Sequence, residues 1–353
     1  MKWKYGLGLL VSGLFLFFAM RSVNLAEFVS ALARARYGYV IPVVALVMLS
    51  LWARAVRWRF LLAPVKLIGV KSLFHATAIG LMANDLLPAR IGEIIRAHVI
   101  GERESISRSA SLATIVVERL LDGFTLLFFL AIVLLSGGVA VPVWLRNASL
   151  AAIAFYAAAF MALVLIGARS DFVAAVGERI ARPFPERVRR AAARLPYSFA
   201  GGLAILKSSR NMALAAALSF LVWLPNAAII HLLLVSFGIR QPPGVSFVLL
   251  VALCIGVMIP SAPGFIGTIQ YVSVTVLGLF GVARGEALSY SLVYHACVYV
   301  PVVATGLWCL AIEGVSFKEM NFMAGKRGET REPAPGEPVP PRRIRTNTER
   351  SGE

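Results

Sequence analysis

Long apolar runs separated by short polar stretches dominate the pattern of this chain. A helix needs about 20 predominantly apolar residues to cross a bilayer, and an uncharged run of that length indicates a membrane span. On this basis the pattern predicts an all-α polytopic membrane protein with about six full spans. The predicted spans are Tyr5–Met20, which is short, Tyr37–Leu62, Ser109–Leu135, Val143–Gly167, Asn211–Phe237 and Ala287–Ile312.

Two further apolar segments are too short to cross and are interrupted by proline and glycine. Ser72–Leu87 runs into Pro88 and is followed by the polar stretch Ala89–Glu104, while Val245–Pro260 and Thr268–Phe280 flank the sequence SAPGFIG. Irregular backbone at membrane depth is tolerated only where protein buries it or where it lines a wet cavity. Each pair of arms is therefore predicted to be a re-entrant hairpin.

The two interrupted segments resemble one another. LLPARIGE and IPSAPGFIG each follow a short apolar arm and each precede a second arm. With the predicted spans they enter from opposite faces of the membrane. Paired broken helices in two halves of a chain indicate an inverted repeat, with the binding site at the repeat interface.

Composition supports the membrane assignment and sets the expected orientation. Of 353 residues, 59% are hydrophobic and only 15% are charged, with a net charge of +17. The basic residues gather in the loop 169–210 and in the tail 314–353, so the positive-inside rule places both segments and both termini in the cytoplasm. We expect a membrane domain over 1–313 and a disordered tail in a bacterial or archaeal inner membrane. The basic loop and tail would contact anionic lipid rather than nucleic acid. The segment Arg21–Arg36 is predicted to be a loop on the far side that is helical in part, and it carries three arginines against this bias.

Three arginines near the end of the second predicted span allow two interpretations. Arg54, Arg57 and Arg59 could extend toward the cytoplasmic headgroups beside Trp52 and Trp58, which is the commoner arrangement. Alternatively, Arg54 or Arg57, which share a helix face, could turn inward to meet an anionic headgroup.

The segment from Ala83 to Asp122 concentrates ionisable side chains between apolar runs. Such groups are costly at membrane depth and usually face a bundle interior where they have a function. Arg90 and Arg96 could hold a phosphate, because a guanidinium binds two oxygens at once. Two features could assist them. The acidic side chains of Glu93 and of the cluster Glu118, Arg119 and Asp122 could orient those arginines or bind an amine. A helix that starts after Gly264 could donate backbone N–H groups to an anion. The structural alternative is that the acids only neutralise buried arginines.

Catalytic and metal-binding patterns are missing from the sequence. The four histidines fit no HExxH pattern, and the chain has no phosphate-binding loop and no GxSxG. His231 and His295 are interpreted as hydrogen-bonded interior residues. Cys254, Cys297 and Cys309 fall in apolar segments and are interpreted as packing residues. We expect no enzyme activity, no metal and no cofactor.

Three segments together resemble the membrane region of lysylphosphatidylglycerol synthases and their stand-alone, flippase-like relatives. They are NDLLPARIGEIIRA, SASLATIVVERLLDGF and IPSAPGFIGTIQ, and the resemblance covers roughly Tyr5 to Glu313. It implies several spans with re-entrant helices and movement of a lipid between leaflets. The third motif usually ends in glutamate, where this chain has Gln270, which removes one titratable group. The aminoacyl-transfer domain of the full synthases is absent, so no lysyl transfer is expected. Residues and resemblance together give these candidate substrate-binding positions: Asn84, Arg90, Glu93, Arg96, Glu118, Arg119, Asp122, Pro263 and Gly264.

The expected function is a membrane lipid translocase for an anionic, zwitterionic or polyprenyl-linked (isoprenoid) lipid. One alternative is a non-transporting accessory or scaffold protein of lipid or envelope biosynthesis, and a weaker one is an intramembrane lipid-modifying enzyme. Expected partners are the lipid itself and either a second copy of the chain or a lipid-biosynthesis enzyme.

Overall fold

The computed structural model describes residues 2–21, 23–87, 91–136, 154–162, 208–259 and 261–313, with a few isolated positions between 147 and 205. Within these ranges the chain is helical with short turns and contains no strand. This confirms the predicted all-α membrane fold.

Four helices are long and apolar enough to cross a membrane, and each matches a predicted span. They are α3 (Val40–Leu62, preceded by the short helix η1, Tyr37–Tyr39), α6 (Arg108–Ser136), α10 (Ser209–Ser236) and α13 (Arg284–Ile312).

The first predicted span is α1 (Lys2–Met20). Its part Leu10–Met20 and α2 (Leu25–Arg34) are together long and apolar enough to cross a membrane, with a bend of 89° between them. The predicted span Val143–Gly167, the basic loop 169–210 and the tail 314–353 lie wholly or mostly outside the described residues.

Helices α3 and α10 pack against each other in antiparallel orientation. Their ends meet where the Arg36 amide donates to the Ser236 carbonyl at 2.9 Å. Near mid-span, the Asn226 side chain donates to the Ser50 hydroxyl at 2.9 Å, and that hydroxyl donates to the Val222 carbonyl at 3.1 Å. Pro225 interrupts the α10 hydrogen-bond ladder at this level, and polar side chains buried there satisfy one another.

The first predicted hairpin consists of α4 (Val70–Leu86) and α5 (Gly92–Glu104). Two glycines let the arms cross closely: a Cβ on Gly92 would lie 1.9 Å from the Gly80 carbonyl oxygen. Asn84 accepts a 2.8 Å hydrogen bond from the Gly92 amide and so fixes the start of α5. The base of the hairpin lies at the C-terminal ends of α3 and α13, where Glu104 binds Lys66 and Arg103 binds Glu313.

The second hairpin consists of α11 (Pro243–Gly256), the short helix η4 (Pro263–Phe265) and α12 (Thr268–Leu279). Its base lies at the opposite end of the bundle, beside the C-terminus of α10, where Gln241 donates to the Phe280 carbonyl at 3.0 Å. Its tip is irregular, with Gly264 at φ 75°, Phe265 at φ 56° and Gly267 at φ 87°.

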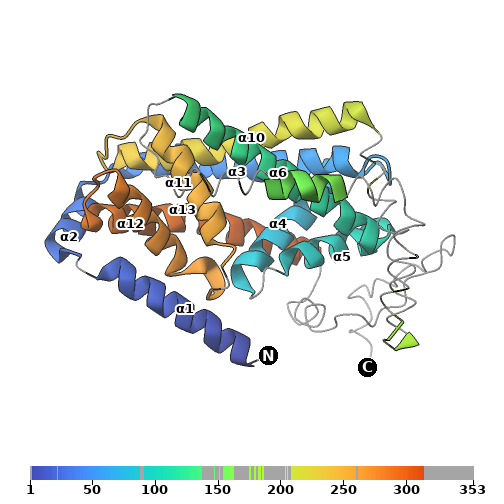
Figure 1. The fold of residues 1–353 in the computed structure, drawn as a ribbon, viewed down its shortest axis with the longest axis horizontal. Coiled ribbons are helices and arrows are strands. Elements are labelled where there is room, and N and C mark those ends of the chain that lie inside the picture. The colour runs from blue at the N-terminus through green and yellow to red at the C-terminus, as the bar shows by residue number, and fades with distance from the viewer. Residues whose placement is uncertain are drawn as a thin grey trace, which may run out of the picture.

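The two hairpins therefore enter from opposite ends, and their tips meet where α4 contacts η4. Figure 1 shows α11 and α12 toward one end of the molecule and α4 and α5 toward the other. The order span, hairpin, span occurs twice, as α3, α4/α5, α6 and as α10, α11/α12, α13. This order and the opposite entry of the hairpins fit the inverted repeat that the broken segments predict.

Candidate functional site

A buried ion cluster joins α3, α5 and α6. Arg57 on α3 contacts Asp122 at 2.6 Å and Glu118 at 3.2 Å. Arg119 contacts Glu118 at 2.8 Å and Asp122 at 3.4 Å. Glu118 and Asp122 lie one turn apart on α6, so one guanidinium from a neighbouring helix reaches both carboxylates.

Arg96 completes the cluster from the first hairpin. It donates two hydrogen bonds of 3.0 Å to the two carboxylate oxygens of Glu118, and its guanidinium lies 3.6 Å from the ring centroid of Trp58. Arg96 is only 4% exposed. Its charge and its fork geometry are therefore used within the protein, and it is not available to a ligand in this conformation.

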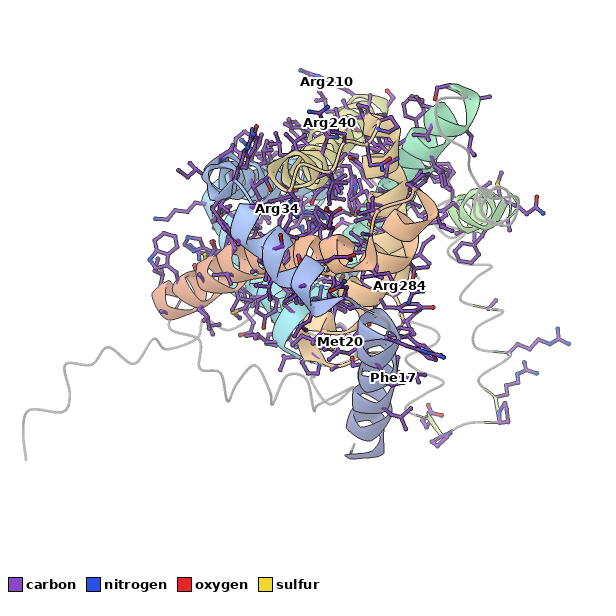
Figure 2. The ribbon with its side chains drawn as sticks, turned by 90° about the vertical axis from the view of Figure 1, so that its left-hand side faces the viewer. Phe17, Met20, Arg34, Arg210, Arg240 and Arg284 are labelled. Carbon is purple, nitrogen blue, oxygen red and sulfur yellow. The ribbon has the colours of Figure 1, made fainter. Side chains whose placement is uncertain are left out.

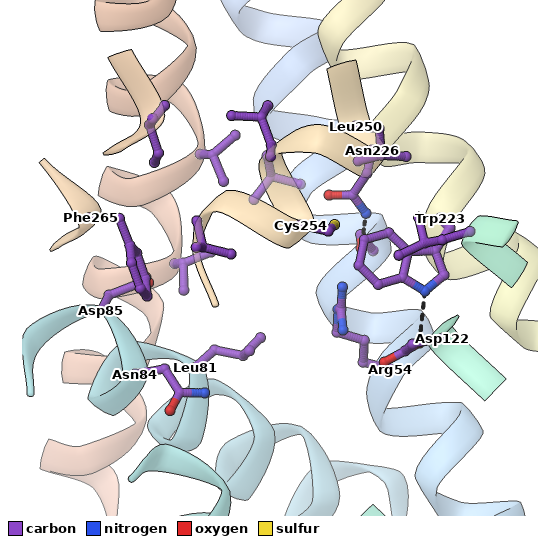
Figure 3. A pocket seen from close by; sticks show the side chains of 18 of the residues that line it. Arg54, Leu81, Asn84, Asp85, Asp122, Trp223, Asn226, Leu250, Cys254 and Phe265 are labelled. Atoms are coloured by element: carbon purple, nitrogen blue, oxygen red, sulfur yellow. Dashed lines mark hydrogen bonds between the residues drawn. The ribbon is translucent and has the colours of Figure 1, made fainter. Parts of the chain in front are cut away.

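Asp122 links the cluster to a second aromatic side chain. Trp223 on α10 donates to Asp122 at 2.7 Å, and the guanidinium of Arg54 lies 5.0 Å from the Trp223 ring centroid. Arg54 is half-buried and faces the open space beside the cluster. Figure 3 shows Arg54, Asp122 and Trp223 together on one wall of this space.

That space is a cavity of about 410 Å³ between the tips of the two hairpins. The first hairpin contributes Leu81, Asn84, Asp85 and Glu93, and the second contributes Met258 and Phe265 among others. Most of the wall is apolar or aromatic. Its charged members are Arg54, Asp85, Glu93, Arg119 and Asp122.

The wall opposite Arg54 is built on α13 and the tip of the second hairpin. Figure 3 places Asp85 beside Phe265 on this side. His295 and Tyr299, which also line the cavity, pack edge to face with ring centroids 5.5 Å apart. Gln270 accepts from the Gly267 amide at 2.8 Å and lies 3.2 Å from the His295 ring nitrogen, so it holds the hairpin tip against α13.

The structure divides the predicted site residues into separate groups. Asn84, Glu93, Arg119 and Asp122 line the cavity, whereas Arg96 and Glu118 lie behind its wall in the ion cluster. Gly264 is buried at the tip of the second hairpin and Pro263 is exposed there. Arg90 and Pro88 lie outside the described residues.

The positions of the arginines in the second predicted span contradict the interpretation that they extend toward the headgroups. Arg57 is fully buried and Arg54 turns toward the cavity, while Arg59 is exposed. Trp58 is buried as well and donates to Thr114 at 2.9 Å instead of lying at the membrane surface. The carboxylates of α6 attract the two inward arginines, and these partners are distant in sequence.

Several residues that line the cavity could not be identified as site residues from the sequence. Trp223, Tyr294 and Tyr299 are aromatic residues in apolar spans, where aromatic residues are common. Asn226 also lines the cavity, and a polar amide beside Pro225 at mid-span is a signal that the sequence does offer. His231, 3.2 Å from the Ser246 hydroxyl, and His295 are hydrogen-bonded interior residues, as predicted. The three cysteines are free thiols within helices.

Metal-binding geometry is missing from the described part of the chain. No group of three or more His, Cys, Asp or Glu side chains is placed there to hold an ion. The charged groups described there form ion pairs or line the cavity.

Comparison with known proteins adds a family assignment. Residues 6–306 match the family described as the lysylphosphatidylglycerol synthase TM region. A UPF0104 membrane protein of Methanothermobacter thermautotrophicus is 25% identical over 308 residues, which cover 83% of this chain and 90% of that protein. Another UPF0104 membrane protein, of Methanocaldococcus jannaschii, is 31% identical over 127 residues, or 34% of this chain and 37% of that one. No solved structure matches. Because the family match covers most of its length, the chain belongs to the family of the lysylphosphatidylglycerol synthase TM region.

Proposed function

We propose that this membrane protein moves a lipid with an anionic, zwitterionic or polyprenyl-linked polar headgroup between leaflets, with the headgroup passing through the cavity between the hairpin tips. One observation supports the proposal above all. Two hairpins that enter from opposite ends meet around an internal cavity, whose mostly apolar wall carries two arginines, Arg54 and Arg119, together with three carboxylates. Alternating access around such a midplane site is how inverted-repeat transporters work.

The apolar part of the wall favours a lipid over a small soluble ion. Met258 lines the cavity and is nevertheless 66% exposed, so the cavity reaches the outer surface of the bundle there. Its neighbours Ile255 and Ile259 are also exposed. Acyl or isoprenoid chains could remain in the surrounding bilayer at this edge while the headgroup occupies the polar interior.

The charges on the wall suit a phosphate and allow a second charged group. Arg54 and Arg119 would replace the water that a phosphate loses on entering the membrane, because guanidinium hydrogen bonds to phosphate are charge-assisted. Asp85 and Glu93 line the same cavity and could bind an amine in a zwitterionic headgroup. The ion cluster would hold Arg119 and Asp122 in place as the hairpins move.

The test is lipid movement in vesicles that contain the purified full-length chain. Fluorescent phospholipids and a fluorescent polyprenyl phosphate serve as probes. Arg54→Gln and Arg119→Gln each remove one charge from the cavity wall, and Arg59→Gln removes an exposed arginine from the same helix as Arg54 as a matched control. A hydrogen bond to a charged group contributes about 1.5–3 kcal/mol, so each cavity variant should slow movement about ten-fold or more.

Two outcomes oppose the proposal. If the cavity variants move lipid as fast as the parent, the headgroup does not pass Arg54 and Arg119. If the parent itself gives no movement above protein-free vesicles with any probe, the accessory or scaffold function is favoured. Co-purification of a stoichiometric partner would then support that alternative.

A further inference from the structure

The end of the bundle at the base of the second hairpin carries an unexpected positive charge. The segments 21–39, 237–242 and 280–287 meet there and hold five arginines against Glu27 and Glu286, a net charge of +3. We call these arginines the arginine collar; its members are Arg21, Arg34, Arg36, Arg240 and Arg284. All five are exposed. Because the predicted topology places this end outside the cytoplasm, the positive-inside rule leaves this charge unexplained.

Helix α2 lies across this end of the bundle. It is turned by 89° from α1 and starts at a cap in which Asn24 accepts from the Ala26 amide at 2.9 Å. Its inner face packs on α13, where Ser289 donates to the Phe28 carbonyl at 2.8 Å and Gly285 leaves no room for a side chain against Glu27. This contact fixes the orientation of α2 and leaves its other face outward.

The outward face of α2 combines apolar and basic side chains. Leu25 is 72% exposed and Val29 is 57% exposed, while Arg34 lies in the last turn. Figure 2 looks onto this end and shows Arg34 on α2 above Arg284, with Met20 and Phe17 below. Arg284 is itself oriented by a 2.9 Å hydrogen bond to the Arg21 carbonyl.

Helix α2 thus has apolar and basic side chains on its outward face and lies across the ends of membrane spans. A short helix of this kind belongs at the level of the lipid headgroups. Its apolar side chains reach the acyl region and its arginines reach the phosphates. Phe17 near the end of α1 and Tyr37 in η1, on either side of α2 in the chain, are exposed aromatic side chains, which membrane interfaces favour.

We propose that α2 and the arginine collar bind the headgroups of anionic phospholipids in the leaflet at this end of the bundle. The surface carries an excess of positive charge beside exposed apolar residues, which is complementary to an anionic lipid and not to a zwitterionic one. The inference is independent of lipid movement through the cavity. A chain that transports nothing would still bind anionic lipid here.

The experiment uses the full chain in vesicles of phosphatidylcholine that contain a trace of photoreactive phosphatidylglycerol or, separately, of photoreactive phosphatidylcholine. After illumination, the labelled peptides are identified by mass spectrometry. The net positive charge of the collar attracts the anionic headgroup and not the zwitterionic one, so the peptide that contains α2 should be labelled several-fold more by the anionic lipid. The variant Arg34→Gln with Arg284→Gln should bring the two lipids close to parity on that peptide.

Two matched variants complete the test. Arg59→Gln with Arg210→Gln removes the same charge from exposed arginines at the opposite end and should leave labelling of α2 unchanged. Arg34→Lys with Arg284→Lys keeps the charge and should retain most of the preference, which separates lost charge from misfolding. Equal labelling of α2 by both lipids in the parent chain, or an unchanged preference after Arg34→Gln with Arg284→Gln, would overturn the inference.

Discussion

At the scale of single residues, burial separates the charged side chains that hold the bundle together from those that can meet a ligand. Glu118 is fully buried and is contacted by Arg57, Arg96 and Arg119. Arg54 is half-buried and faces the cavity. A loss of lipid movement in a Glu118 variant would therefore not identify Glu118 as a substrate contact, because the same change would disturb the fold.

Glu118→Gln tests this division. Removing the carboxylate leaves Arg57 and Arg96 without most of their compensating charge, and breaking a buried ion pair in this way costs about 3–5 kcal/mol. We expect a large fall in the unfolding free energy measured in detergent. Glu102→Gln, in a partly exposed ion pair with Arg108, should cost less than about 1 kcal/mol. Comparable stability for both variants would contradict a structural role for Glu118.

The sequence predicts local pairs of residues much better than distant ones. Arg119 and Asp122 are three apart on a helix, and the predicted pairing is present at 3.4 Å. The partners of Glu118 from α3 and α5 could not be read from spacing, because they depend on how helices pack. The same reason explains the inward Arg54 and Arg57, since nothing within their own helix shows that carboxylates of α6 lie beside them.

At the scale of elements, the prolines and glycines that interrupt the short apolar arms mark both hairpins. A glycine allows the crossing of α4 and α5, because any side chain at Gly92 would overlap the Gly80 carbonyl and Asn84. The bend between α1 and α2 was harder to predict from the sequence. The polarity of Arg21–Arg36 predicts a loop that is helical in part, and α2 is its helical part, stabilised by the Asn24 cap and by contact with α13.

Gly92→Ala should therefore weaken the first hairpin. The added methyl group would force α4 and α5 apart, and overpacking of this kind costs about 1–3 kcal/mol. Faster hydrogen exchange across α5 and a lower unfolding temperature in detergent are the expected results. Gly278→Ala is the matched control, because a Cβ there meets nothing within 4 Å and alanine favours a helix by up to about 1 kcal/mol over glycine. Equal stability of the two variants would show that the arms do not cross as described.

At the scale of the whole molecule, the opposite orientation of the two hairpins brings them together into one site. Each hairpin alone is a short helix pair. Because they enter from opposite ends, their tips meet and enclose a cavity that adjoins the ion cluster. The approximate location of this site was predictable from the two broken segments, but its wall was not, because α10 and α13 contribute side chains such as Trp223 and Tyr299 through packing alone.

The central claim is that a lipid headgroup occupies this cavity. The most direct measurement is an experimental density map of the full chain in nanodiscs made from native membrane lipid. We predict headgroup density between the hairpin tips, within hydrogen-bonding distance of Arg54 or Arg119, with its chains leaving beside Met258. A cavity that is closed or holds only water, with lipid confined to the outside of the bundle, would contradict the account.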